Sequence, residues 1–428
     1  MAVANFGDVV NTRRPSEFRP KRKSDSDSVV NQDAQATNVQ VPLDQHIYVS
    51  FTIKDGESSM AFQDLVQLYL QPAAKEIASA VDKVIVGQAH KFLANTAGRL
   101  NEMTSSNAKD FVLEARQKMN QNKAYVNARN LVLSPTAETD ILATELFIAA
   151  NQRGDGGTAL EEARLGRILG FDTYMDQNVS SVLLNGSGAY TAGATIAAAA
   201  IGATTISVNI PAYAAIDGEF VHIAGEGKPH IVSSAADDGT NTNSIVLTTG
   251  LESAVANAAA VTVWEAYKVD NTSYAAGYAK QIRLQGQDDG ATLMAPPQLG
   301  QLLAFGTGVS RHTYTIIDAE VDPDSANDYL VMLDRPLVSA LADNDYAFPG
   351  PQGSYNLAFH RNALALVTRP LAMPASSLGV STSVGVYNDI AMRAAMQYNI
   401  TSQGTIVTLD LLCGVALLDA NLGCVLLS

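Results

Sequence analysis

Residues 39–53, VQVPLDQHIYVSFTI, alternate apolar and polar side chains with a period of two. The apolar positions are Val39, Val41 and Leu43, followed by Ile47, Val49, Phe51 and Ile53. A period of two is typical of half-buried strands, because successive side chains point to opposite faces of a sheet. The two alternating runs predict two strands, which we expect to pair with one another as a long hairpin.

Downstream of Ser58 the apolar period changes to that of a helix. Two groups of residues share one helical face: Phe62, Leu65, Val66 and Tyr69 before Pro72, and Ile77, Val81, Val84 and Ile85 after it. The pattern predicts a helix from Ser58 to about Ala97, broken or kinked at Pro72, which would reach on the order of 50 Å. Few compact enzymes need a rod of this length.

A compact α/β segment is expected next. The patterns predict a helix over residues 111–119, a strand over 125–133 and a second helix that Ser134 caps and Pro135 begins. A strand follows over residues 170–179. Helix and strand patterns resume at residues 357–371, and the apolar run that closes the chain is typical of a central strand.

The composition shifts to Ala, Thr, Gly, Asn and Asp between about Gly186 and Gly353. Short alternating runs in this stretch predict a β-rich insertion. The insertion contains an internal repeat that aligns Gly218 with Gly300 and Leu251 with Leu337. The offset between the copies grows from 82 to 86 residues, as an insertion in the second copy would produce. Chance similarity between two low-complexity β sequences is the alternative.

A basic segment, RRPSEFRPKRK, precedes the alternating runs at residues 13–23. Its six basic residues are Arg13, Arg14, Arg19, Lys21, Arg22 and Lys23. Two prolines exclude a continuous helix, so we expect an extended arm. The arm is either a solvated tail or a contact across an acidic neighbouring subunit. Nucleic-acid contact is a lesser option, because it would favour a basic face on the folded body as well.

Composition narrows the class of protein further. The 428 residues suffice for two or three domains, and charged residues make up 17% of the chain, below the usual share of about 25%. The net charge of -15 argues against binding to nucleic acid or anionic membranes. Two cysteines, Cys413 and Cys424, fit a reducing cytoplasm and two small buried side chains. The N-terminus has no pattern of a secretory signal, and the uncharged stretch 177–216 is too polar for lipid.

Motifs that carry chemistry are not found in the sequence. It contains no GxxxxGK or GxGxxG phosphate loop, no HExxH or CxxC metal motif and no GxSxG elbow. His222 and His230 could meet across a hairpin, but a metal site needs further ligands. The acidic run from Asp322, DPDSAND, lacks the glycine and the distal glutamate of a calcium loop. Although catalytic triads are defined in space, we expect no catalytic, cofactor or metal site.

Five fragments carry a family resemblance. They are VPLDQHIYVSFTI (41–53), ARNLVLSP (128–135), LEEARLGRILGFDTYMDQNV (160–179), LAFHRNALALVTRPL (357–371) and MRAAMQYNITSQGTIVTLDLLCGV (392–415). In order and spacing they resemble coat proteins of short-tailed bacteriophages, whose capsid fold is called the Hong Kong ninety-seven type. The resemblance implies an α+β fold in a structural subunit, the major capsid protein, that assembles into hexamers and pentamers around double-stranded DNA.

The resemblance also implies a division of the chain. The expected parts are an N-terminal arm (1–23), an extended loop hairpin (24–57), a spine helix with the peripheral domain (58–106), the first part of the axial domain (107–185), the β-rich insertion domain with two similar modules (186–353), the axial return (354–388), a peripheral strand (389–403) and the axial C-terminal strand (404–428). The basic residues of the arm would contact a neighbouring subunit.

Partners follow from the same resemblance. No long charged helical region precedes the arm, so a separate scaffolding protein is implied, together with a portal protein and a possible decoration protein. The shell would assemble in the bacterial host cytoplasm and persist in the virion, without a membrane. Some relatives cross-link subunits through a lysine and an asparagine; Lys54 and Asn399 are of the right types, but the sequence does not show that they meet. An encapsulin-like shell, a phage tail or adhesion protein and an enzyme are the alternatives.

Overall fold

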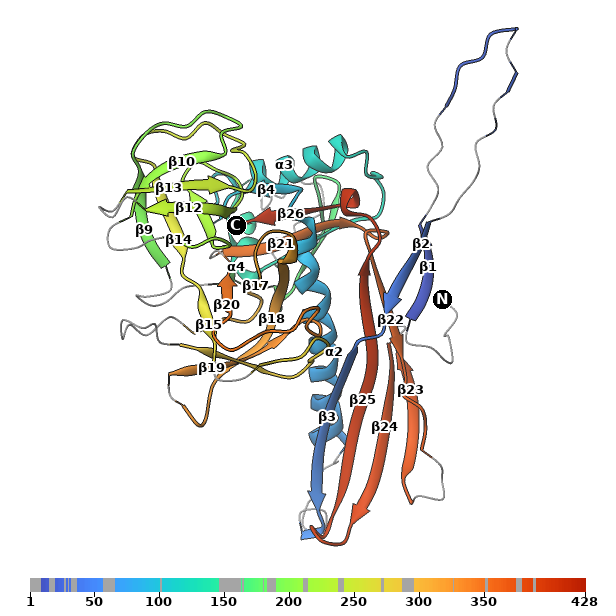
Figure 1. The fold of residues 1–428 in the computed structure, drawn as a ribbon. Helices are drawn as coiled ribbons and strands as arrows, with labels where there is room; N and C mark the ends of the chain where they lie inside the picture. Colours follow the sequence, from blue (N-terminus) through green and yellow to red (C-terminus); the bar gives the residue numbers. More distant parts are fainter. Residues whose placement is uncertain are drawn as a thin grey trace. The chain divides into compact units, whose positions relative to one another are not determined.

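The computed structural model describes residues 9–14, 20–26, 28–29, 31, 37–56, 66–100, 102–145, 163, 165–179, 181–182, 190–210, 215–237, 242–270, 273–286, 296–325, 327–350, 353–374, 379–387 and 390–428. The described part is mostly β-structure with few helices (Figure 1). The chain divides into two compact units. Unit 1 holds Met1–Val81 and Leu364–Asp419, and unit 2 holds Asp82–Ala363 and Ala420–Ser428.

The sheet of unit 1 is built around one long strand, β25, Gly404–Leu417. Its antiparallel partners are β3 (Gln45–Lys54), β24 (Ile390–Asn399) and β22 (Leu364–Arg369), and β23 (Ser381–Tyr387) pairs with β24. Gly404 is the register partner of both Lys54 and Asn399, so β3 and β24 lie on opposite edges of β25. The alternation predicted for β3 is present, with half-buried side chains at odd positions and exposed ones at even positions.

The expected hairpin between the two alternating runs is wrong. β2, Thr37–Pro42, pairs with β1, Val9–Arg14, whereas β3 pairs with β25, more than 300 residues away. A period of two identifies the two faces of a strand but not the strand that it pairs with. Two alternating runs that are neighbours in the sequence therefore need not pair with each other. Residues 1–23, expected as an unpaired arm, therefore contain a strand of a two-stranded ribbon.

Helical structure runs from Val66 to Phe92. It comprises the π-helix η1 (Val66–Leu70), α2 (Gln71–Val86) and the 3₁₀ helix η2 (Gly87–Phe92). The residues from Ser58 to Leu65 that were expected to begin the helix lie outside the described ones. Pro72 is the second residue of α2, where a first turn tolerates proline, and the change from π- to α-helix occurs beside it. The helix ends before Ala97, which belongs to strand β4, Thr96–Gly98.

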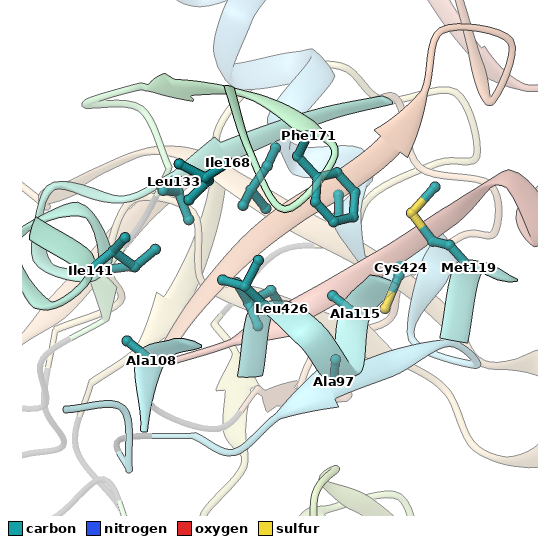
Figure 2. Packing of buried hydrophobic residues seen from close by; sticks show 14 of the residues in the cluster. Ala97, Ala108, Ala115, Met119, Leu133, Ile141, Ile168, Phe171, Cys424 and Leu426 are labelled. Carbon is teal, nitrogen blue, oxygen red and sulfur yellow. The ribbon is translucent and has the colours of Figure 1, made fainter. Parts of the chain in front are cut away.

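The body of unit 2 is a seven-stranded sheet with two helices. In spatial order its strands are β4, β26 (Gly423–Leu427), β21 (Gly353–His360), β5 (Arg129–Leu133), β7 (Phe171–Met175) and β6 (Arg167–Ile168), while β8 (Ser181–Val182) also pairs with β21. Figure 2 shows the core that these strands share with α3, Ala108–Gln121, and α4, Pro135–Leu142. Met119, Leu133, Ile141 and Phe171 are all fully buried there.

The start of α4 confirms a local prediction. Ser134 is the N-cap residue, its hydroxyl oxygen accepts a hydrogen bond from the amide of Ala137 at 3.2 Å, and Pro135 occupies the first turn. The amide of Ser134 itself donates to the buried side chain of Asn356 at 2.6 Å. That side chain also donates to the carbonyl of Leu426 at 3.1 Å, so one amide joins the end of β5 to two neighbouring strands.

Two expected segments form different elements from those predicted. Residues 357–371, read as mixed helix and strand, form β21 and β22, because periodicity alone does not separate a short buried strand from a buried helix. The C-terminal run 404–428, expected as one strand, forms β25 and β26 in different sheets, with the 3₁₀ helix η5, Ala420–Leu422, between them. Similarly, the strand expected from Tyr125 begins at Arg129.

The stretch with shifted composition forms two closed six-stranded barrels within unit 2. Barrel 1 comprises β9 (Tyr190–Thr195), β10 (Thr205–Asn209), β11 (Phe220–Ile223), β12 (His230–Asp237), β13 (Thr242–Leu247) and β14 (Ala260–Trp264). Barrel 2 comprises β15 (Tyr267–Val269), β16 (Ile282–Gln285), β17 (Leu302–Phe305), β18 (His312–Val321), β19 (Asp328–Leu333) and β20 (Tyr346–Pro349). The 3₁₀ helix η3, Gly308–Ser310, links β17 to β18. Each barrel has its own apolar core.

The two barrels have the same strand order. Barrel 1 closes in the order β9, β10, β13, β12, β11, β14, and adding six to each number gives the order of barrel 2. Gly218 and Gly300 occupy matching positions, with φ of 101° and 78° and amides that donate to the carbonyls of Val232 and Ile316. Register irregularities follow at these same two residues, in β12 and in β18. The positions aligned in the sequence thus have matching backbone roles.

The ends of the barrel pair meet in the body sheet. Val182 of β8 is the register partner of Gly353 of β21, so the chain leaves the sheet and returns to it on adjacent strands. This pairing brings together two positions separated by 170 residues of sequence. A short bridge could therefore join them.

Candidate functional site

The basic segment is divided between the ribbon and its connection. Arg13 and Arg14 belong to β1, while Lys21, Arg22 and Lys23 are exposed in the connection to β2. Arg19 lies outside the described residues. Within the described part of the chain, no ion pair is formed by Arg13 or by the three basic residues 21–23. Their positive charge is therefore open to another molecule.

The ribbon that carries this segment has little support of its own. β1 and β2 pair over six residues each, and an isolated two-stranded ribbon is marginally stable in water. At its base, Val41 is fully buried and packs against Ala365 and Ala416 of unit 1. The described residues between the paired strands, 20–26, 28, 29 and 31, are exposed. Docking on a partner would stabilise this part of the ribbon.

A buried ion pair secures the unit 1 sheet. Asp410 of β25 is 3% exposed, and Arg393 of β24 donates to both its carboxylate oxygens, from Nε to Oδ1 at 2.9 Å and from Nη2 to Oδ2. Arg393 also donates through Nη1 to the carbonyl oxygen of Ala372. A bidentate arginine with its remaining donor engaged satisfies a buried carboxylate well. The pair therefore holds the segment after β22 against the sheet.

Lys54 and Asn399 lie on the same rung of this sheet, on either side of Gly404. They are separated within one chain by the whole width of β25. Nearby, the hydroxyl of Tyr398 donates to a carboxylate oxygen of Asp55 at 2.6 Å. This geometry gives no support to a bond between Lys54 and Asn399 of the same chain.

Barrel 2 is joined to the body of unit 2 by buried polar contacts. Gln88 of η2 donates to Asp334 at 3.1 Å, and Thr315 of β18 donates through its hydroxyl to the carbonyl of Gly87 at 2.7 Å. Asp334 also accepts from the amide of Thr315 at 3.0 Å and pairs with Arg335. Since buried polar groups are costly to leave unpaired, these contacts fix barrel 2 on η2. No sequence motif pointed to Gln88 or Thr315.

The two barrels meet through an apolar cluster of Phe220, Trp264, Ala304 and Phe348. Arg311 lies over the rings of Phe220 and Phe348, at 4.7 and 5.3 Å from their centroids. It donates to the carbonyl of Gly218, but its Nε and Nη2 have no partner among the described residues. Burial lowers the pKa of Arg311 to about 10. A buried guanidinium with few partners was not detectable from the sequence, because its neighbours are distant in the chain.

Negative charge is concentrated in the insertion. Residues 186–353 contain 18 of the 43 acidic residues but only 6 of the 28 basic residues. The remaining 260 residues are close to balance. One chain therefore combines an exposed basic segment with a strongly acidic pair of barrels.

Candidate catalytic and metal residues do not assemble into a site. Among the described residues, no group of three or more His, Cys, Asp or Glu side chains could hold a metal ion. His222 and His230 lie on the neighbouring strands β11 and β12, as expected, yet no further ligand joins them. Asp322 instead forms an ion pair with Arg283, whose Nε lies 2.6 Å from Asp322 Oδ2. Burial raises the pKa of both cysteine thiols to about 12, which leaves them unreactive near neutral pH.

The buried pair Glu226 and His230 has a structural role. His230 Nε2 lies 3.2 Å from Glu226 Oε2, and the same carboxylate accepts from the amides of Glu252 and Ser253 at 3.1 and 2.7 Å. In barrel 2 the matching amide, that of Val338, donates to the hydroxyl of Tyr314 at 2.9 Å. The two arrangements hold corresponding loops of the two barrels, so a catalytic role is not needed to explain the Glu226–His230 pair.

No helix in the described ranges is both long enough and apolar enough to cross a membrane.

No protein-family model matches the chain, and no curated protein matches it. Solved structures do match. A structure of Mycobacterium phage Che8 is 10% identical, with 98% of this chain and 84% of that chain covered and a TM-score of 0.40. The capsid structure of cyanophage P-SCSP1u is 9% identical, with 99% and 84% covered and a TM-score of 0.45.

The asymmetric unit of the mature capsid of bacteriophage PhiM1 is 13% identical, with 60% of this chain and 82% of that chain covered and a TM-score of 0.33. All three matches are phage structures that share little sequence with this chain. All three TM-scores are below 0.5.

Proposed function

We propose that this protein is the major capsid protein of a tailed bacteriophage, a structural subunit that works by assembling with copies of itself. The observation that carries the proposal is the exposed ribbon with basic residues 21–23, which have no ion-pair partner among the described residues of their own chain. A second copy supplies the acidic surface that such a segment needs. The five sequence fragments that resemble coat proteins of short-tailed phages support the same proposal.

The finer assignments belong to this proposal. The subunits form hexamers and pentamers of an icosahedral shell around double-stranded DNA, without sequence-specific contacts and without catalysis. A separate scaffolding protein, a portal protein and a possible decoration protein are its partners. Assembly takes place in the host cytoplasm, and the mature subunit resides in the virion.

The domain division is adjusted to the observed pairing. We assign the extended loop to residues 9–42, because β1 and β2 pair with one another. Unit 1 corresponds to the peripheral part and the body of unit 2 to the axial part. The insertion domain, residues 186–353, is supported by its two closed barrels and by the adjacent strands at its ends.

Expression of the full-length chain with and without the genes that neighbour it tests the proposal. Negative-stain images and sedimentation velocity should show closed shells of uniform diameter. The triple variant Lys21→Glu, Arg22→Glu, Lys23→Glu should remain folded but form few closed shells. A matched control, Lys75→Glu, Lys123→Glu, Lys280→Glu, carries the same charge change on exposed sites and should assemble.

Other outcomes would identify the alternatives. Shells that enclose an enzyme would indicate an encapsulin-like compartment, and fibres or discs without closed shells would indicate a tail or adhesion protein. A chain that stays monomeric with every neighbouring gene product present would contradict a capsid role.

A further inference from the structure

A groove of about 510 Å³ lies between the two barrels of unit 2. Barrel 1 contributes Ile216 and Asp217, and barrel 2 contributes residues of two loops, within 306–310 and 339–345, together with Tyr346 and Phe348 of β20. Clefts that bind ligands commonly measure about 300 to 1,000 Å³ and often lie between domains. The groove is therefore large enough to receive one or two long side chains.

The chemistry of the groove favours a cation. Its lining includes the carboxylates of Asp217 and Asp345 and contains no lysine or arginine. Tyr346 is 40% exposed there, and its ring stacks at 6.1 Å on that of the buried Phe348. An exposed aromatic face beside carboxylates attracts a guanidinium or an ammonium group and repels an anion.

Each carboxylate keeps one oxygen for a ligand. Asp217 Oδ1 accepts from the amide of Ala235 at 3.1 Å, and Asp345 Oδ2 accepts from the amide of Ala342 at 2.7 Å. The second oxygen of each has no hydrogen-bond partner among the described residues. The backbone contacts hold both side chains in place, so the free oxygens are positioned before any ligand arrives.

The chain itself carries a matching group. Residues 20–24 are exposed and have no regular secondary structure, and their sequence is PKRKS. In an extended segment the side chain of Arg22 points away from those of Lys21 and Lys23. Arginine binds carboxylates in a planar fork and stacks on aromatic rings, which suits it to this groove better than lysine.

We propose that the groove between the barrels binds the basic segment of a second copy of this chain, with Arg22 over Tyr346 and between Asp217 and Asp345. This inference deepens the proposed capsid function, because it names the surface on which the basic segment docks. The contact joins the most positive segment of one subunit to the acidic insertion of its neighbour. Lys21 and Lys23 then point to the opposite side of the extended segment, away from the groove.

A synthetic peptide of residues 18–26, FRPKRKSDS, tests the contact directly on the unassembled full-length chain. Trp264 is the single tryptophan of the protein and packs with Phe348, a wall of the groove, so its fluorescence reports binding. The wild-type peptide should give a saturable change that weakens with salt. Arg22→Gln in the peptide should abolish it, and Tyr346→Ala in the protein should weaken it about fivefold to thirtyfold.

Val338→Ala is the matched control, because this side chain is 53% exposed on barrel 2 and does not line the groove. It should bind the peptide like the wild type. A peptide that binds Tyr346→Ala as well as the wild type, or gives no saturable change, would overturn the inference.

Exchanging the charges of Arg22 and Asp217 distinguishes a failure of the groove contact from a failure of the capsid proposal. Arg22→Glu and Asp217→Arg should each reduce shell yield, and their combination should restore it. Shells that form normally with Asp217→Arg and Tyr346→Ala would refute the groove contact and leave the capsid function intact. A chain that forms no shells under any condition would refute the capsid function itself, whatever the peptide does.

Discussion

Replacing Gly218 with alanine probes the joint between the barrels. Gly218 has φ of 101°, and a Cβ atom there would lie 2.8 Å from Cζ and 2.9 Å from Cε2 of Phe348. Phe348 is 1% exposed and belongs to the apolar cluster between the barrels, so its ring has little room to move. Gly218→Ala therefore combines backbone strain with overpacking of this interface.

The two contributions can be separated with Gly202→Ala. Gly202 also lies in barrel 1 and has φ of 81°, but no atom lies within 4 Å of its added Cβ. Left-handed backbone strain alone should destabilise that variant by about 1–2 kcal/mol. Overpacking adds about 1–3 kcal/mol at Gly218, so Gly218→Ala should cost about 2–5 kcal/mol. In a domain of this size each 1 kcal/mol lowers Tm by about 2–4 °C.

Calorimetry of the full-length chain measures both losses, and Trp264 fluorescence follows the interface during the melt. A Gly218→Ala variant that melts like Gly202→Ala would show that Phe348 does not constrain this position. Adding Phe348→Ala supplies a second check. If the clash is real, the double variant should be more stable than the sum of the two single losses predicts.

Three further predictions concern the insertion, assembly and pH. Replacing residues 186–352 with a short glycine-serine linker should leave a body that folds, because Val182 and Gly353 are register partners; loss of a cooperative melt by circular dichroism would contradict this. Assembly followed by light scattering should slow as sodium chloride approaches 1 M, where the Debye length is about 3 Å, and sodium sulfate should not slow it equally if apolar contacts also contribute. Burial and the neighbouring charge of Asp176 raise the pKa of Asp82 from 3.8 to about 6. Protonated Asp82 therefore stabilises the folded state fully below pH 3.8, and this contribution is lost as the pH rises through 6. Asp82→Asn should therefore raise Tm above pH 6 and have no such effect near pH 3.8, whereas an equal shift at both would rule out titration of Asp82 as the cause.

Local chemistry could be predicted from the sequence where its cause is local. Ser134 and Pro135 specify the start of α4, because a cap needs only the residues within one helical turn. Gly218 and Gly300 could be aligned because a positive φ favours glycine at both matching turns. The face of β3 could likewise be predicted, since alternation along one strand needs no knowledge of its partner.

Partners distant in the chain were decided only by the tertiary structure. β2 and β3 have the same alternating pattern, and nothing in that pattern states that one pairs with β1 and the other with β25. The groove residues Asp217 and Tyr346 belong to different barrels and share no motif. The order of residues specifies which side chains face inward and where turns occur. The free energy of pairing two distant strands depends instead on whether their surfaces fit together once the long loops between them have closed.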